Sequence, residues 1–293
     1  MTTFLLFTAE VLSGIIFTTA GAYFVKKISS DSRGIYLFNA LCSLIATICV
    51  FIICRINLNT SLFILKFGII FGIATMAMSL LRTFAAKEGP LGHTSLIVTL
   101  SSVITAASGC IFWHERLTLF KVIGIILMVI CFIFSIDLSN KENKQKTLKW
   151  FMFSILAMLA TVGVGLIQKI QQESTYKSNF GTFLFAAFVA ETIISFALYF
   201  IEKQRNKTIE VKFYINLKYI ICMLISGICI GTANITAVIL TGRVDTALVF
   251  PIVNGVPLMG NIVLGMILFN ERIQKRQLIG IASGILAIAC LCI

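Results

Sequence analysis

The feature that most constrains this chain is a recurring run of about 20 apolar residues, the length that a helix needs to cross the hydrocarbon core of a bilayer. Ten such runs with short polar breaks between them fill most of the 293 residues. They lie at roughly 3–24, 34–54, 64–84, 93–113, 117–136, 149–170, 180–201, 217–240, 246–269 and 275–293. We therefore expect an all-α membrane protein with ten transmembrane helices.

Composition agrees with this interpretation and excludes a soluble domain. Only 12% of the residues are charged, about half the usual share of a globular domain, and 58% are hydrophobic. The first run is not typical of a signal peptide, because it has no basic segment before it and carries Glu10 within it. We expect it to be retained as the first membrane span.

The formal charge of +12, from 24 Lys and Arg against 12 Asp and Glu, would suggest nucleic acid in a soluble chain. Here the cations lie mainly in loops, so no nucleic-acid partner is expected. Loops after odd-numbered runs hold 17 of the basic residues and loops after even-numbered runs hold 7. The positive-inside rule then predicts cytoplasmic odd-numbered loops and both termini outside the cell.

Nine scattered cysteines and two histidines show no metal-ligand spacing. We expect no metal site, no disulfide framework and no cofactor.

An internal repeat appears when the chain is aligned with itself at an offset of 156. Residues 109–125 and 265–281 share seven identities in 17 positions, including a Gly-x-Ile-x-x-x-Glu-Arg segment in each copy. The two copies predict a five-helix repeat at 1–138, a basic linker at 139–148 and a second repeat at 149–293. Five spans is an odd number, so the second repeat is predicted to be inverted relative to the first, with a substrate site where the repeats meet.

The tail of each repeat, a short span, Glu-Arg and then a Gly-containing span, resembles the EamA-like transporters of the drug/metabolite transporter superfamily. This resemblance implies ten helices in two inverted five-helix repeats, transport of a small molecule, and a multi-pass protein of the bacterial plasma (inner) membrane. It also implies cytoplasmic termini, contrary to the charge count, and the orientation stays open. The proline typical of the fourth helix of a repeat is present as Pro257 but is replaced by Ser101 in the first repeat.

Ten of the twelve acidic residues lie in loops or at the ends of runs, whereas Glu10 and Glu191 lie near the middle of theirs. A charged side chain at membrane depth costs about 2.5–3.5 kcal/mol even on insertion scales, so it normally faces a cavity or a partner. Loss of hydration there favours the neutral carboxyl group, which suits a proton-coupling role. Glu10 shares a helical face with Gly14, Phe17 and Gly21, where another helix or a substrate could approach. A protonated carboxyl group bonded to a neighbouring helix is the alternative, and for Glu191 a structural role is at least as well supported.

Polar stripes in two later runs are further candidates for substrate binding. In the run 246–269, Asn254, Pro257 and Asn261 recur at helical spacing, and Asn234 has a similar position in the run 217–240. Proline frees backbone carbonyl groups and asparagine both donates and accepts hydrogen bonds. Close helix packing uses the same residue types, so cavity lining and packing remain open for these stripes.

Other residues of the repeat favour structural roles. The Glu-Arg pairs at span junctions suit ion pairing and capping, and the glycines of the following spans suit helix packing. These structural candidates are Glu115, Arg116, Glu271, Arg272, Pro257, Gly124 and Gly280.

The function that these features favour is secondary active transport by alternating access, with protons as the coupling ion and a small-molecule substrate. No phosphate-binding Gly-x-x-x-x-Gly-Lys-Ser/Thr motif is present, so ATP drive is not encoded. A membrane enzyme on lipid-linked substrates and a non-transporting scaffold are the alternatives. Glu10 favours cationic or zwitterionic substrates, unless Arg82 reaches the cavity. The oligomeric state is left open, with a monomer compatible with these features.

Overall fold

The computed structural model describes residues 2–28, 31–54, 56, 61–114, 118–135, 144–205, 217–270 and 275–291. Within these ranges the regular structure is helical and contains no strand, which confirms the all-α prediction. The helices are α1 Thr2–Tyr23, η1 Phe24–Ile28, α2 Ser32–Ile53, α3 Leu62–Glu88, α4 Leu91–Thr99, α5 Ser101–Trp113, α6 Leu119–Ser135, α7 Lys144–Glu173, η2 Lys177–Asn179, α8 Phe180–Arg205, α9 Leu217–Thr241, α10 Thr246–Phe269 and α11 Lys275–Leu291.

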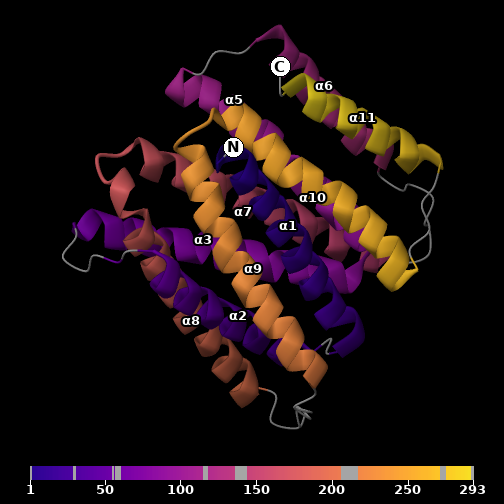
Figure 1. Ribbon diagram of the computed structural model, residues 1–293. Coiled ribbons are helices and arrows are strands. Elements are labelled where there is room, and N and C mark those ends of the chain that lie inside the picture. The colour runs from indigo at the N-terminus through magenta and orange to yellow at the C-terminus, as the bar shows by residue number, and fades with distance from the viewer. Residues whose placement is uncertain are drawn as a thin grey trace.

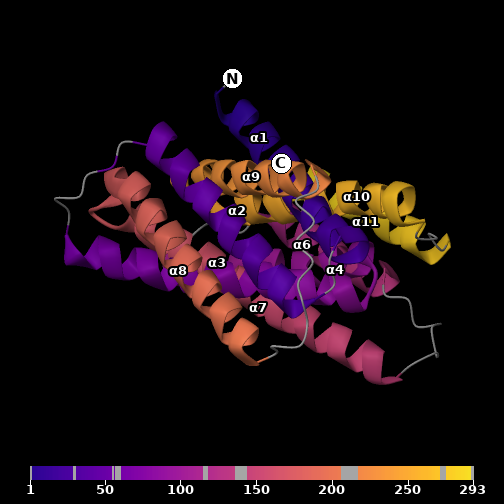
Figure 2. The same cartoon turned by 90° about the horizontal axis from the view of Figure 1, so that it is seen from below.

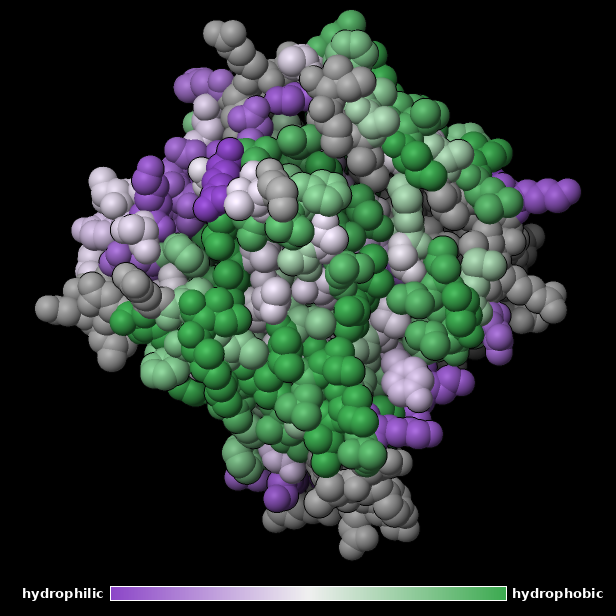
Figure 3. All heavy atoms as spheres, viewed as in Figure 1, coloured by the Kyte–Doolittle hydropathy of each residue, from purple (hydrophilic) through white to green (hydrophobic). Residues whose placement is uncertain are grey.

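Seven helical segments in the described ranges are long and apolar enough to cross a membrane. They are Thr2–Ile28, Ser32–Ile53, Leu62–Glu88, Leu148–Glu173, Lys177–Arg205, Leu217–Thr241 and Thr246–Phe269. Large apolar side chains such as Ile52, Ile193 and Ile267 are exposed on the outside of the bundle. Figure 3 shows hydrophobic residues over most of one face, with hydrophilic residues gathered towards its margins. The protein is therefore an integral, multi-pass membrane protein.

The helices pack in a pattern that mixes the two ends of the chain (Figures 1 and 2). α1 packs against α9, and α3 packs against α7. α2 contacts both α8 and α9, while α8 also contacts α3. α10 lies against α1, α4 and α5, and α6 pairs with α11 along one side of the bundle. The centre of the molecule is thus surrounded by α1, α3, α4, α7, α9 and α10.

Glycines allow two of these pairs to approach closely. A Cβ atom added to Gly68 of α3 would lie 2.7 Å from the carbonyl oxygen of Phe183 in α8. A Cβ atom added to Gly227 of α9 would lie 2.8 Å from the carbonyl oxygen of Cys42 in α2. In both α3 and α9 a second glycine follows four residues later, so each helix presents a small surface to its neighbour.

The run 93–113 differs from the single helix that we predicted, because it is divided at Leu100 into α4 and α5. Around Leu100 the backbone hydrogen bonds tighten to a spacing of three residues, from Leu100 N to Ile97 O and from Val103 N to Leu100 O. The hydroxyl of Ser102 also donates to the carbonyl of Thr99, a local bond that competes with the helical pattern. The proline-free repeat therefore carries the break, whereas α10 continues through Pro251 and Pro257.

Two other boundaries differ from the predicted ones. The first helix continues past residue 24 as a π-helix to Ile28. α7 begins at Lys144 rather than at residue 149, so the end of the expected linker is helical. Lys and Gln are good helix formers, which allows α7 to extend beyond its apolar segment.

Two helices end in the same way at matching positions of the sequence repeat. His114 follows α5 with φ 53°, and its N–H donates to the carbonyl of Gly109. Asn270 follows α10 with φ 52°, and its N–H donates to the carbonyl of Gly265. Both residues are left-handed caps, a common way for a helix to end.

Candidate functional site

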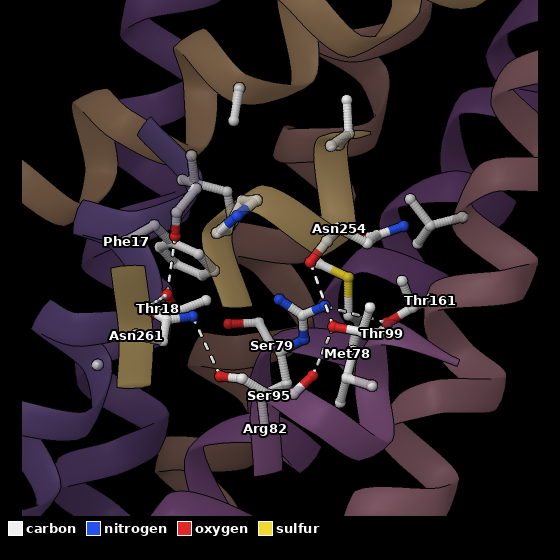
Figure 4. Close-up of a pocket in the computed structure, with 18 of the residues that line it drawn as sticks. Phe17, Thr18, Met78, Ser79, Arg82, Ser95, Thr99, Thr161, Asn254 and Asn261 are labelled. Atoms are coloured by element: carbon white, nitrogen blue, oxygen red, sulfur yellow. Dashed lines mark hydrogen bonds between the residues drawn. The ribbon is translucent and has the colours of Figure 1, made fainter. Parts of the chain in front are cut away.

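A cavity of about 140 Å³, lined by both apolar and polar side chains, lies at the centre of the bundle. Its walls come from α1, α2, α3, α4, α7, α9 and α10, so residues far apart in the sequence meet around it. Figure 4 shows side chains of α1, α3, α4, α7 and α10 around this common space. A space of this size holds on the order of ten waters or one small solute.

One face of α1 forms a wall of the cavity. Glu10, Gly14, Phe17 and Gly21 all line it, as their shared helical face requires. Pro257 of α10 packs against Gly14, where an added Cβ atom would lie 3.5 Å from the proline ring. Small residues therefore bring α1 close to α10 while the larger ones face the cavity.

Glu10 is 6% exposed and is held by a threonine of α9. The Thr236 hydroxyl lies 2.8 Å from Oε2 of Glu10 and 2.9 Å from the carbonyl oxygen of Thr232. A hydroxyl has one proton to donate. It can donate to an ionised Glu10, or donate to Thr232 and accept a hydrogen bond from a protonated Glu10. Both protonation states of the carboxyl group are therefore accommodated.

Asn261 of α10 connects three helices. Its Oδ1 accepts a hydrogen bond of 2.8 Å from Thr18 of α1, and its Nδ2 donates one of 3.1 Å to Ser95 of α4. The side chain is 2% exposed, and both ends of its amide are engaged. Asn261 thus lines the cavity but holds its walls together.

Asn254 and Asn234 also line the cavity, and their side chains differ in hydrogen bonding. The side-chain amide of Asn254 has no hydrogen-bond partner in the part of the chain that the structure describes. The backbone carbonyl oxygen of Asn254 accepts a hydrogen bond of 3.2 Å from the Thr99 hydroxyl. Asn234 donates to the carbonyl of Ile230 at 3.0 Å and accepts from Gln168 at 3.5 Å. Asn254 is therefore the asparagine with an amide available to a solute.

Arg82 of α3 reaches the cavity as well. In Figure 4 its guanidinium group lies between Thr18 and Asn261 on one side and Thr161 on the other. Its Nη2 lies 3.5 Å from the Thr161 hydroxyl, a long hydrogen bond. Glu10 and Arg82 are the acidic and basic side chains among the described residues that line the cavity.

Glu191 lies outside this cavity. It is 1% exposed, and its Oε2 accepts a hydrogen bond of 3.0 Å from Thr75, between α8 and α3. The structure therefore does not bring the two buried glutamates to one site.

Among the described residues with predicted structural roles, Pro257 lines the cavity and the two glycines lie away from it. Gly124 of α6 and Gly280 of α11 are buried in helices that pack against each other. Glu115, Arg116, Glu271 and Arg272 lie outside the described residues.

Sequence reasoning missed the wall that α7 contributes. Thr161 and Gln168 line the cavity there, and both are buried. The available signal was a stripe at a spacing of seven, Ser154, Thr161 and Gln168, which places three polar residues on one face of a membrane helix. The sequence raises Arg82 as a residue that could reach the cavity. Its position at the end of an apolar run does not reveal which way its side chain points.

Comparisons with known proteins bear on this architecture. A solved structure titled "Crystal structure of protein" matches with a TM-score of 0.67 at 14% identity, over 99% of this chain and 97% of that one. At this identity the likeness concerns the fold. A comparison with curated proteins finds no match.

The family model of the EamA-like transporter family matches residues 4–136, which contain the first of the two Gly-x-Ile-x-x-x-Glu-Arg segments. The family resemblance that the first of these segments helped to predict is thereby confirmed over residues 4–136, which are similar to the EamA-like transporter family of the drug/metabolite transporter superfamily.

Proposed function

We propose that this protein is a secondary active transporter that moves a small metabolite or amphipathic organic solute by alternating access, coupled to protons. The observation that carries this proposal is the central cavity, which is lined by helices from both halves of the chain and contains the membrane-embedded carboxyl group of Glu10. A cavity between repeats is where secondary transporters bind their solutes. The family match supports a transporter of this type.

The architecture that we propose is ten spans in two inverted five-helix repeats. Seven spans are long enough by themselves. α4 and α5 together form the eighth, and α6 and α11 form the remaining two. α6 and α11 have 17 helical residues each, at the short end of the range for a membrane helix. The matching left-handed caps at His114 and Asn270 support equivalence of the helices that they end.

The helix contacts support the same arrangement. If α1 corresponds to α7 and α3 to α9, the α1–α9 contact becomes the α3–α7 contact. With α2 and α8 exchanged as well, the α2–α9 contact becomes the α3–α8 contact. Each of these pairs is present, as a two-fold relation between repeats requires.

Coupling to protons is assigned to Glu10. Burial favours the neutral form of a carboxyl group, and the Thr236 hydroxyl can serve either protonation state. We propose that the carboxyl group takes up a proton when the cavity opens to one side and releases it when the cavity opens to the other.

A flux experiment tests this role. The solute is first chosen by screening purified protein for thermal stabilisation by amino acids, amines and drug-like cations. In proteoliposomes, Glu10→Gln is expected to abolish accumulation driven by a pH gradient while solute exchange without a gradient continues, because glutamine keeps the size of the side chain but carries no exchangeable proton. Glu191→Gln is the matched control, since this glutamate is equally buried but lies outside the cavity. Accumulation by Glu10→Gln at the rate of the wild type would show that the coupling group is elsewhere.

A further inference from the structure

The guanidinium group of Arg82 is a charge without a counter-charge in the described part of the chain. Thr161 provides its one long hydrogen bond, and its Nε has neither solvent contact nor a hydrogen-bond partner. None of the carboxylates in the described ranges forms an ion pair with it. A buried cation is costly unless it is paired, so a group that pairs with Arg82 would be bound strongly.

The Arg82 side chain points towards the middle of the membrane rather than towards water. A long cationic side chain near a helix end normally extends towards water. Arg82 instead reaches Thr161, which lies at the middle of the span Leu148–Glu173. The guanidinium group therefore faces the cavity at membrane depth, where an incoming solute would meet it (Figure 4).

Resting on the proposed transport function, we infer that Arg82 is the subsite for a carboxylate group of the transported solute. A guanidinium group presents two parallel N–H groups that match the two oxygens of a carboxylate. The cavity of about 140 Å³ limits the solute to a small one, and its Asn254 amide provides a further donor and acceptor. Glu10 at the other charged position of the cavity suits an amino group, so an amino-acid-like zwitterion fits both.

Binding to a matched panel tests the carboxylate subsite. The panel contains the common L-amino acids, each with its decarboxylated amine and its deaminated acid, and glycerol 3-phosphate as a phosphate probe. Thermal stabilisation of the purified full-length protein is the readout. Ligands with a carboxylate are expected to stabilise the wild type, and the amines are not.

Variants then separate the subsite from a structural role. Arg82→Gln is expected to weaken carboxylate binding at least tenfold, about the loss for a hydrogen bond to a charged group. Arg82→Lys keeps the charge and loses the paired N–H groups, so its affinity for carboxylates is expected to lie between those of the wild type and Arg82→Gln. This variant also provides the test if the glutamine variant does not fold. Lys169→Gln is the control, because Lys169 is a buried cation that pairs with Glu173 at 2.9 Å outside the cavity.

The inference is overturned if both Arg82 variants bind carboxylates as tightly as the wild type, if the amines bind as well as the acids, or if the phosphate probe alone binds. If no panel member binds but other solutes are transported in proteoliposomes, the carboxylate subsite is wrong and the transporter stands. If no solute of any class is transported, the proposed function itself fails.

Discussion

At the residue scale, two asparagines on the same helix offer a direct separation of binding from packing. Asn261→Ala removes bonds from α10 to both α1 and α4 and is expected to cost about 1–2 kcal/mol, which lowers Tm by a few degrees. Asn254→Ala removes an amide without a protein partner in the described ranges and is expected to leave Tm unchanged. In the second variant, KM for the solute should rise about five- to tenfold, the effect of one hydrogen bond.

Thermal unfolding in detergent and uptake kinetics on the same preparations distinguish the two effects. A large loss of stability in Asn254→Ala, with KM unchanged, would assign this residue to packing and would remove it from the substrate site.

Single residues also show how far sequence reasoning extends. The face of α1 that carries Glu10 and Gly14 follows from helical periodicity, and the structure places that face on the cavity. Helical periodicity does not predict the separation of Glu10 from Glu191. That separation arises because α8 packs against α2 and α3 rather than around the cavity. Contact of Arg82 with Thr161 joins α3 to α7, and no local pattern specifies that pairing.

At the element scale, the stability of the bundle depends on how closely α3 approaches α8. A Cβ atom at Gly72 would overlap the backbone carbonyl group of Ala187, which cannot move aside as a flexible side chain can. Gly72→Ala is therefore expected to destabilise the protein by about 1–3 kcal/mol, the usual range for overpacking.

The control for this substitution is Gly163→Ala in α7, where an added Cβ atom meets nothing within 4 Å. Alanine also favours helix over glycine by up to about 1 kcal/mol, so this variant should be as stable as the wild type or more so. The measurement is Tm together with the elution profile of the purified protein. Equal behaviour of the two variants would mean that the α3–α8 approach contributes little to stability.

Elements were predictable where length and hydrophobicity alone decide them. The long apolar runs become long helices, since backbone groups in a bilayer must bond within their own segment. The break at Leu100 was not predictable from proline positions, because the Ser102 hydroxyl and backbone hydrogen bonds that span three residues instead of four accompany it.

At the scale of the whole molecule, the number of crossings can be tested by a single position between α5 and α6. With ten spans, Thr118 lies on the same side as Ser61 and Asp245 and opposite Asp31. If only the seven longer helices crossed, Thr118 would share a side with Asp31. The ion pair of 3.0 Å between Lys121 and Asp245 brings the start of α6 to the start of α10, which agrees with ten spans.

Single cysteines at positions 31, 61, 118 and 245 of a cysteine-free variant, labelled in sealed vesicles with a membrane-impermeant maleimide, make this measurement. We expect positions 61, 118 and 245 to label from one side and position 31 from the other. Labelling of positions 118 and 31 from the same side would contradict the two-repeat architecture and with it the inverted relation on which alternating access depends. The same experiment decides the orientation: access to position 31 from the cytoplasmic side would agree with the positive-inside count, and access from outside would agree with the orientation that the family resemblance implies.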